Sequence, residues 1–314
     1  MDRKKYINVN KIIFFIIAYL VPWVFVPWIK QGTMSLVFGE YIMTLPTSGV
    51  ILGEWYINKG KKKDFFQKIF IVGSCCFSIY IFFCITGVVP QGYMIIWEQG
   101  LIIIFSILLF VYCLIYGGES LYPFKNKKKM VAIVGTYIVI KGIHLAVFGI
   151  DFRCGIYIID QIWSIPSKMI FSCLSFMGEE FAWRGYLQKR LQECMGKRMG
   201  VITLGIIWEL WHIPLWVTTF QLNQQEAGLG IMIAARFFNV IGFAIFLGWV
   251  YMKTENVWLC ALLHGMNNNM LSGVVSGTLE VRGIPIGAII QPVILWMFIF
   301  LKEYSFYNKR HLKY

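Results

Sequence analysis

Charged side chains are scarce in this sequence, and acidic ones are the scarcest. Only 14% of the 314 residues are Asp, Glu, Lys or Arg, whereas 58% are hydrophobic and 17% are aromatic. A soluble domain of ordinary composition carries roughly a quarter charged residues. The composition therefore excludes an ordinary soluble domain.

The sequence also lacks a polar stretch long enough for a separate soluble domain, an internal repeat and a low-complexity tract. Its eight cysteines never stand at a C-x-x-C spacing, and most of them lie inside apolar runs. We therefore expect neither disulfides nor thiolate metal sites, and we interpret the cysteines as small buried hydrophobic residues.

Long hydrophobic runs take the place of these features. A bilayer core of about 30 Å needs about 20 apolar residues per helix. Residues 12–29, 69–89 and 284–301 come close to this length without a charge. Weaker runs cover 34–57, 91–117, 131–150, 157–178, 201–220, 229–252 and 257–275. These runs are too long and continuous for barrel strands. We predict an all-α, polytopic transmembrane helical bundle of about eight to ten helices, with the first run retained as an anchor.

The net charge of +13 comes from basic residues that gather between alternate hydrophobic runs. In a soluble protein this charge would suggest a nucleic-acid partner, but here we expect none, because the positive-inside rule explains the pattern. The opposite loops hold only Lys30, Arg153 and Arg282. We expect an integral, multi-pass protein of the cell membrane with both termini cytoplasmic. The basic groups are Arg3, Lys4, Lys5 and Lys11; Lys59, Lys61, Lys62, Lys63 and Lys68; Lys125, Lys127, Lys128 and Lys129; Arg184, Lys189, Arg190, Lys197 and Arg198; Lys253; and Lys302, Lys309, Arg310 and Lys313.

Polar residues inside the hydrophobic runs are sparse before about residue 140 and frequent from Lys141 to Asn269. We therefore divide the chain into N-terminal transmembrane helices (1–155), a functional core (156–280), and a C-terminal transmembrane helix with a basic tail (281–314). Lys141 and His144 share a helical face, which favours an interhelical polar contact over a substrate contact.

Two adjacent carboxylates and an arginine stand near the end of one run, in Glu179-Glu180-Phe181-Ala182-Trp183-Arg184. On a helix Glu180 and Arg184 are four residues apart and can pair, while Glu179 is turned about 100° away. The pairing leaves Glu179 as the candidate general base. An interfacial charge cluster that anchors the helix is the alternative.

Two later runs carry His212 and His264, the second followed one turn later by Asn268. At 1.5 Å per residue both histidines lie roughly 10 to 17 Å into the membrane from the cytoplasmic side. The glutamate pair reaches the same side from the opposite direction. A carboxylate, two imidazoles and an amide donor are the groups needed to activate a water molecule and stabilise an oxyanion.

These motifs resemble those of the CPBP (CAAX protease and bacteriocin-processing, or Abi) intramembrane proteases, which include the type II CAAX prenyl endopeptidases. The pattern is E-E-x-x-x-R, F-x-x-x-H and H-x-x-x-N, and it covers roughly residues 165 to 275. The resemblance implies that Glu179 and His212 hold the attacking water, and that His264 and Asn268 stabilise the tetrahedral oxyanion. It implies a membrane-associated peptide or protein substrate, such as a prenylated C-terminus, a pheromone or a bacteriocin precursor.

The sequence departs from that pattern at two neighbouring positions. Trp208 replaces the usual phenylalanine, which keeps an aromatic wall and enlarges it. Glu209 stands three residues before His212, and Glu-x-x-His is a possible metal-ligand spacing. No cofactor is expected with certainty: a divalent metal such as zinc stays an alternative, with Glu179, His212 and His264 as ligands, although we favour a metal-independent glutamate protease.

Arg236 is expected near the substrate pocket with Trp208 and Glu209, either binding a substrate carboxylate or pairing with Glu209 or Glu180; we favour pairing. Two other functions stay open for the whole chain. One is a non-catalytic immunity or scaffold protein that binds or masks the target of a peptide toxin. The other is a proton-coupled transporter, for which the sequence shows no inverted repeat. We favour an intramembrane endopeptidase whose site opens toward the cytoplasm.

Overall fold

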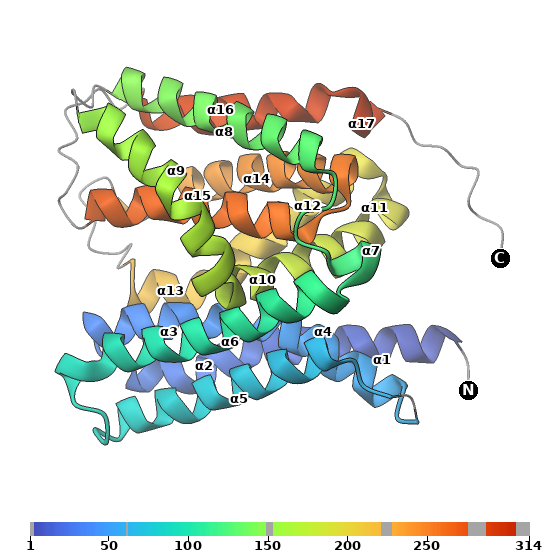
Figure 1. Cartoon of the computed structure of the whole chain (residues 1–314), viewed down its shortest axis with the longest axis vertical. Helices are drawn as coiled ribbons and strands as arrows, with labels where there is room; N and C mark the ends of the chain where they lie inside the picture. Colours follow the sequence, from blue (N-terminus) through green and yellow to red (C-terminus); the bar gives the residue numbers. More distant parts are fainter. Residues whose placement is uncertain (1–2, 61, 149–152, 221–227, 276–286, 306–314) are drawn as a thin grey trace.

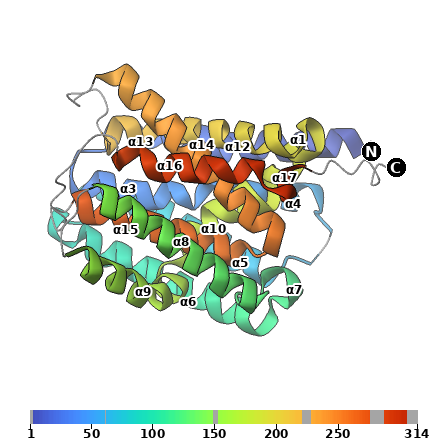
Figure 2. The same ribbon diagram turned by 90° about the horizontal axis from the view of Figure 1, so that it is seen from above.

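The computed structural model describes residues 3–60, 62–148, 153–220, 228–275 and 287–305, and the regular structure within them is entirely helical. Most helices run roughly along one direction and lie side by side in several layers (Figures 1 and 2). The prediction of an all-α polytopic bundle is therefore confirmed. In order, the longer helices are α1 (Arg3–Phe15), α3 (Thr33–Met43), α4 (Leu45–Ile57), α5 (Phe65–Ile85), α6 (Met94–Tyr116), α8 (Lys127–Phe148), α9 (Arg153–Phe171), α10 (Cys173–Glu180), α12 (Lys197–Trp211), α14 (Leu229–Thr254), α15 (Val257–Val275) and α16 (Gly287–Met297).

Short segments connect these helices. They are η1 (Ile16–Leu20), α2 (Val21–Phe25), η2 (Val26–Trp28), η3 (Gln91–Tyr93), α7 (Gly118–Leu121), η4 (Phe181–Gln188), α11 (Lys189–Met195), α13 (Ile213–Thr218), η6 (Phe298–Phe300) and α17 (Lys302–Ser305).

Five helical segments among the described residues are long and apolar enough to cross a membrane: 9–28, 33–57, 65–85, 91–116 and 229–254. The protein is therefore an integral membrane protein. The other predicted runs also form helices, including α8, α9, α12 and α15, but these do not meet the same length and hydropathy criteria. Helix α12 has only 15 residues, and α8 begins with three consecutive lysines.

The predicted run 157–178 is not one continuous helix. It breaks at Ser172, whose φ of −131° and ψ of 12° lie outside the helical region. The backbone N–H of Leu174, just beyond the break, donates to the hydroxyl oxygen of Ser106 on α6 at 3.0 Å. The break thus leaves α10 as a short, fully buried helix with its own direction in the middle of the bundle.

Helix α10 packs directly on the junction between α3 and α4. The hydroxyl of Thr47 donates to the carbonyl oxygen of Met177 at 3.1 Å. A Cβ atom built at Gly178 would stand 2.3 Å from the carbonyl oxygen of Met43. Only glycine permits this approach, so Gly178 sets the position of the residue that follows it, Glu179.

Basic loops meet at one end of the bundle. Lys125 lies 3.5 Å from Glu255, and Lys253 pairs with Glu303 at 2.9 Å. Lys197 donates to the backbone oxygen of Glu303 at 2.9 Å. Helices α7, α11 and α17 lie at this end in Figure 1. This grouping agrees with the predicted alternation of basic loops. Arg282, the boundary at 280, and the tail residues Lys309, Arg310 and Lys313 lie outside the described residues.

The expectation that the cysteines are buried holds for Cys84, Cys113, Cys173 and Cys260. It is wrong for Cys75 and Cys194, which are exposed. Cys75 stands on an outward face of α5, and Cys194 lies on the short helix α11.

Candidate active site

Glu180 and Arg184 form a fully buried ion pair, both side chains being 0% exposed, with Arg184 Nε 2.8 Å from Glu180 Oε2. Arg184 Nη1 also donates to the carbonyl oxygen of Ala244 on α14 at 3.2 Å. Its guanidinium lies 5.0 Å from the ring centre of Trp208. The predicted pairing of these two residues is therefore present.

The spacing argument assumed that a regular α-helix carries this pair, but the helix is irregular. Directly after Glu180 it widens into the π-helical segment η4. π-helical turns are rare and occur frequently at functional sites. The Glu180–Arg184 contact still forms because the side chains bridge one turn of the wider helix.

Glu179 is held quite differently from its neighbour. Its carboxylate is 2% exposed, and Oε2 accepts hydrogen bonds from two indole N–H groups. Trp208 donates at 2.6 Å and Trp183 at 3.1 Å. Uncharged donors therefore hold Glu179, whereas Arg184 forms its ion pair with Glu180. The asymmetry expected from the sequence is present.

His264 lies on the opposite side of Glu180. Its Nδ1 is 3.0 Å from Glu180 Oε1, and only 4% of the residue is exposed. Aromatic rings enclose the imidazole, with ring centres of Trp208 at 5.2 Å and Phe176 at 5.4 Å. Nδ1 lies close to the carboxylate without meeting the angle of a hydrogen bond, and Nε2 is the ring nitrogen left to face a substrate.

His212 stands at the end of α12. Its Nδ1 lies 2.9 Å from the carbonyl oxygen of Trp208. A carbonyl oxygen can only accept, so Nδ1 carries the hydrogen, and in the neutral imidazole Nε2 keeps a lone pair. Glu209 Oε2 lies 3.3 Å from the same Nδ1. His212 is thereby oriented with an acceptor nitrogen available to a water molecule.

Glu209 is fully buried and already has partners. Both Nε and Nη2 of Arg236 donate to it, the second at 3.2 Å, and Trp216 Nε1 donates at 3.0 Å. We favoured pairing of Arg236 with Glu209 or Glu180, and the structure contains the pair with Glu209. Glu209 thus connects Arg236 with Nδ1 of His212.

Asn268 lies one turn beyond His264 on α15 and is half-buried. The adjacent Asn267 accepts hydrogen bonds through Oδ1 from Tyr137 at 3.0 Å, Lys141 at 2.9 Å and Gln291 at 3.1 Å. This network provides the interhelical polar contact predicted for Lys141. The side chain of His144 lies outside the described residues.

Trp208 is the centre of the arrangement. It donates to Glu179, lies under Arg184, and packs against both His212 and His264, with ring centres at 6.0 Å and 5.2 Å. Glu179 and His212 therefore both contact this indole. The sequence interpretation gave Trp208 only the role of an aromatic wall and missed its donor function.

Two further side chains near the site were missed. Trp183 stands four residues after Glu179. Residues at this spacing are neighbours on one helical face, so the sequence could have predicted their hydrogen bond. Glu40, on α3, lies beside Ser175 and within electrostatic range of Glu179 and His264. No motif contains Glu40, so only the packing of α3 on α10 reveals it.

A metal ion would need ligands that converge. Among the described residues, no group of three or more His, Cys, Asp or Glu side chains is placed to hold one. Glu179 instead receives two indole donors, and Nδ1 of each histidine faces a protein acceptor. These Nδ1 contacts do not occupy Nε2 of either histidine, so the alternative ligand set of Glu179, His212 and His264 stays a hypothesis, and no step below passes through a metal.

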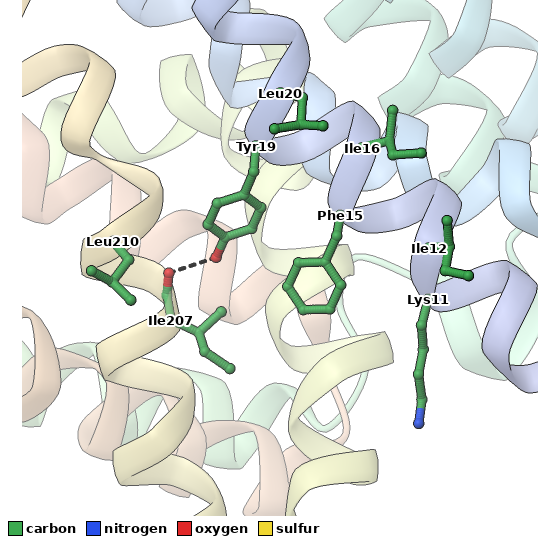
Figure 3. A pocket seen from close by; sticks show the side chains of 8 residues that line it. All are labelled: Lys11, Ile12, Phe15, Ile16, Tyr19, Leu20, Ile207 and Leu210. Atoms are coloured by element: carbon green, nitrogen blue, oxygen red, sulfur yellow. Dashed lines mark hydrogen bonds between the residues drawn. The ribbon is translucent and has the colours of Figure 1, made fainter.

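A separate apolar groove of about 580 Å³ lies between the first helix and α12 (Figure 3). The hydroxyl of Tyr19 crosses it to donate to the backbone oxygen of Ile207 at 2.6 Å. None of the predicted site residues lines this groove, which faces outward, so it is not the candidate active site. Its lining residues are Lys11, Ile12, Phe15, Ile16, Tyr19, Leu20, Ile207 and Leu210.

Comparison with known proteins agrees with the motif resemblance. Residues 161–270 match the family model described as "Type II CAAX prenyl endopeptidase Rce1-like". A curated protein of Methanococcus maripaludis, named CAAX prenyl protease 2, is 25% identical over 112 residues. That match covers 35% of this chain and 41% of the relative's length. No solved structure matches the chain. The recognition of a CAAX-type protease domain in the functional core is thereby confirmed.

Proposed function

We propose that the chain is an intramembrane endopeptidase that hydrolyses a peptide bond with a water molecule activated by Glu179. One observation carries the proposal: the two adjacent buried carboxylates are held by different partners. Glu180 is occupied by Arg184 and His264, whereas the carboxylate of Glu179 accepts hydrogen bonds from two indole N–H groups and forms no ion pair with an arginine or lysine among the described residues. A general base needs a carboxylate that is positioned but not neutralised by a fixed cation.

The proposed reaction has two steps. Glu179 takes a proton from water, which His212 Nε2 orients, while the water oxygen attacks the carbonyl carbon of the scissile bond. Glu179 then gives that proton to the leaving nitrogen as the carbon–nitrogen bond breaks. Asn268 and Nε2 of His264 donate to the oxyanion of the tetrahedral intermediate, and Glu180 balances the imidazolium charge. A buried site strengthens each of these contacts.

The proposed substrate is a membrane-associated or lipid-anchored protein or peptide. The match to a CAAX prenyl protease supports a substrate of this class, and the candidate membrane-spanning helices support a site within the membrane region. We propose that both termini and the site opening face the cytoplasm of a cell membrane. The clustering of basic loops at one end of the bundle supports this orientation.

The test compares membrane peptides from cells that lack the protein and receive wild type, Glu179→Gln or no protein, by mass spectrometry at matched expression. We expect new termini only with the wild type. Glu193→Gln, an exposed carboxylate on α11, is the matched control and should behave as wild type. If Glu179→Gln reproduces the wild-type peptides, the proposal is wrong. If the wild-type and Glu179→Gln samples match each other and both differ from cells without the protein, the protein has a non-catalytic role such as immunity.

A further inference from the structure

A second polar cluster lies beside the proposed catalytic side chains and outside the three motifs. The carboxylate of Glu40 is near Ser175 and in electrostatic range of Lys168, Glu179 and His264. Glu98 is in turn within range of Glu40. The helices that carry the cluster pack against one another. Its members are Glu40 on α3, Glu98 on α6, Lys168 on α9 and Ser175 on α10.

Two polar atoms of this cluster are buried without a hydrogen bond. Glu98 is 3% exposed and Ser175 is 0% exposed, and neither Glu98 Oε1 nor Ser175 Oγ has a hydrogen-bond partner among the described residues. Ser175 faces Glu40 without reaching hydrogen-bond geometry. Leaving such a group unpaired costs about 1–3 kcal/mol. Native proteins usually satisfy buried polar groups of this kind with ordered water.

The cluster also lies along a direction that leads into the site. Glu98 is one turn from the beginning of α6, and Glu40 is two turns from the beginning of α3. Both helices begin at the end of the bundle opposite α7, α11 and α17 (Figure 1). Glu98 interacts electrostatically with Glu40, and Glu40 interacts with Ser175, which stands one turn before Glu179 on α10.

We propose that Glu98, Glu40 and Ser175 hold a short file of water molecules that supplies Glu179 from the end of the bundle opposite the basic loops. The proposal rests on the proposed function, because hydrolysis consumes one water molecule per peptide bond. A peptide lying in the site from the basic end would block water from that side. A separate hydrated path would let water reach Glu179 while a peptide is bound.

The size of the cluster favours water over a substrate side chain. One water molecule needs a space of only roughly 10–15 Å³ and two to four polar partners. Lys168 offsets part of the negative charge that would attract a cation.

Radiolytic hydroxyl labelling of the full-length protein, read by mass spectrometry, tests the route without needing a substrate. Phe176 is the reporter, since it is 5% exposed and lies between Lys168 at 5.7 Å and His264 at 5.4 Å. Phe70, which is 0% exposed and packed on Phe66, is the dry control. Radiolysis of a bound water molecule produces hydroxyl radicals that react with the side chain beside it. We therefore expect Phe176 to be labelled about 5-fold faster than Phe70.

Three variants separate water binding from folding. Glu40→Leu and Ser175→Ala should each lower the labelling of Phe176 toward that of Phe70, whereas Glu40→Gln, which still binds water, should keep it. Ser175→Ala removes a single atom and protects the test against a misfolded Glu40→Leu. Equal labelling of Phe176 and Phe70 in the wild type overturns the proposal, as does labelling that both Glu40→Leu and Ser175→Ala leave unchanged.

Peptide hydrolysis gives the second readout. Glu40→Leu should lower kcat about 10-fold with little change in KM, since the water supply is affected and peptide binding is not, and Glu40→Gln should restore kcat. A change confined to KM overturns the assigned role. Failure of the proposed function is recognised separately, by a wild type and a Glu179→Gln variant that give the same peptides while the labelling pattern persists.

Discussion

His264 Nδ1 lies 3.0 Å from Oε1 of Glu180, whose other oxygen accepts the hydrogen bond of Arg184 at 2.8 Å. One carboxylate thus connects the η4 arginine with the α15 histidine, and all three side chains are 5% exposed or less. Glu180 therefore holds together two helices that are far apart in the sequence, and it orients the imidazole proposed to face the oxyanion.

Glu180→Gln should destabilise the whole protein. Removing one partner of a buried ion pair costs about 3–5 kcal/mol, because the remaining charge is left uncompensated. Thermal unfolding in detergent should show a clear fall in Tm relative to Glu193→Gln. The double variant Glu180→Gln/Arg184→Gln should lose less than the sum of the single variants. Additive losses would show that the two residues do not act as a pair.

Glu179→Gln should separate activity from stability. The amide oxygen of glutamine can still accept from the indoles of Trp183 and Trp208, so we expect a Tm close to that of wild type. Loss of a general base should lower kcat about 10²- to 10⁴-fold. The measurements are peptide cleavage and thermal unfolding on the same preparation. Unchanged cleavage would remove Glu179 from the chemistry.

Trp208→Phe tests the indole donor while keeping an aromatic ring, and it restores the residue usual in the resembling family. Hydrogen bonds to charged groups contribute about 1.5–3 kcal/mol, so the loss of this 2.6 Å bond to Glu179 should lower kcat about 10-fold or more. Trp163→Phe is the control, since Trp163 is 77% exposed. If Trp208→Phe cleaves as fast as wild type, the indole serves as a wall and not as a donor.

Local spacing explains which parts of the site the sequence predicted. The Glu180–Arg184 contact and the position of Asn268 one turn beyond His264 follow from helical periodicity within single segments. Pairing of Arg236 with a carboxylate was also anticipated, but the sequence left its partner open between Glu209 and Glu180. Each of these relationships depends on one helix or on charge balance alone.

The remaining features arise from contacts between distant segments. The break at Ser172 depends on the hydroxyl of Ser106 on another helix, and Glu40 approaches Glu179 only because α3 packs on α10. No spacing rule within a single run contains this information. The same reason explains why an unbroken helix was predicted across 157–178.

Gly178→Ala is the sharpest test of how the fold positions the site. Its added methyl group would lie 2.3 Å from the carbonyl oxygen of Met43 and 2.9 Å from the Cα of Thr44, both backbone atoms that cannot move aside. Overpacking of this kind costs about 1–3 kcal/mol. To relieve it, α10 must shift away from the α3–α4 junction and carry Glu179 with it.

We therefore expect Gly178→Ala to lower both Tm and kcat. Gly100→Ala is the matched control, because Gly100 is also helical but has no heavy atom within 4 Å of the added Cβ. Replacing a helical glycine with alanine where space allows should be neutral or stabilise by about 0.5–1 kcal/mol. Since both variants make the same chemical change, a difference between them reports the close approach at Gly178 alone. Equal Tm and kcat in the two variants would contradict the packing of α10 on the α3–α4 junction.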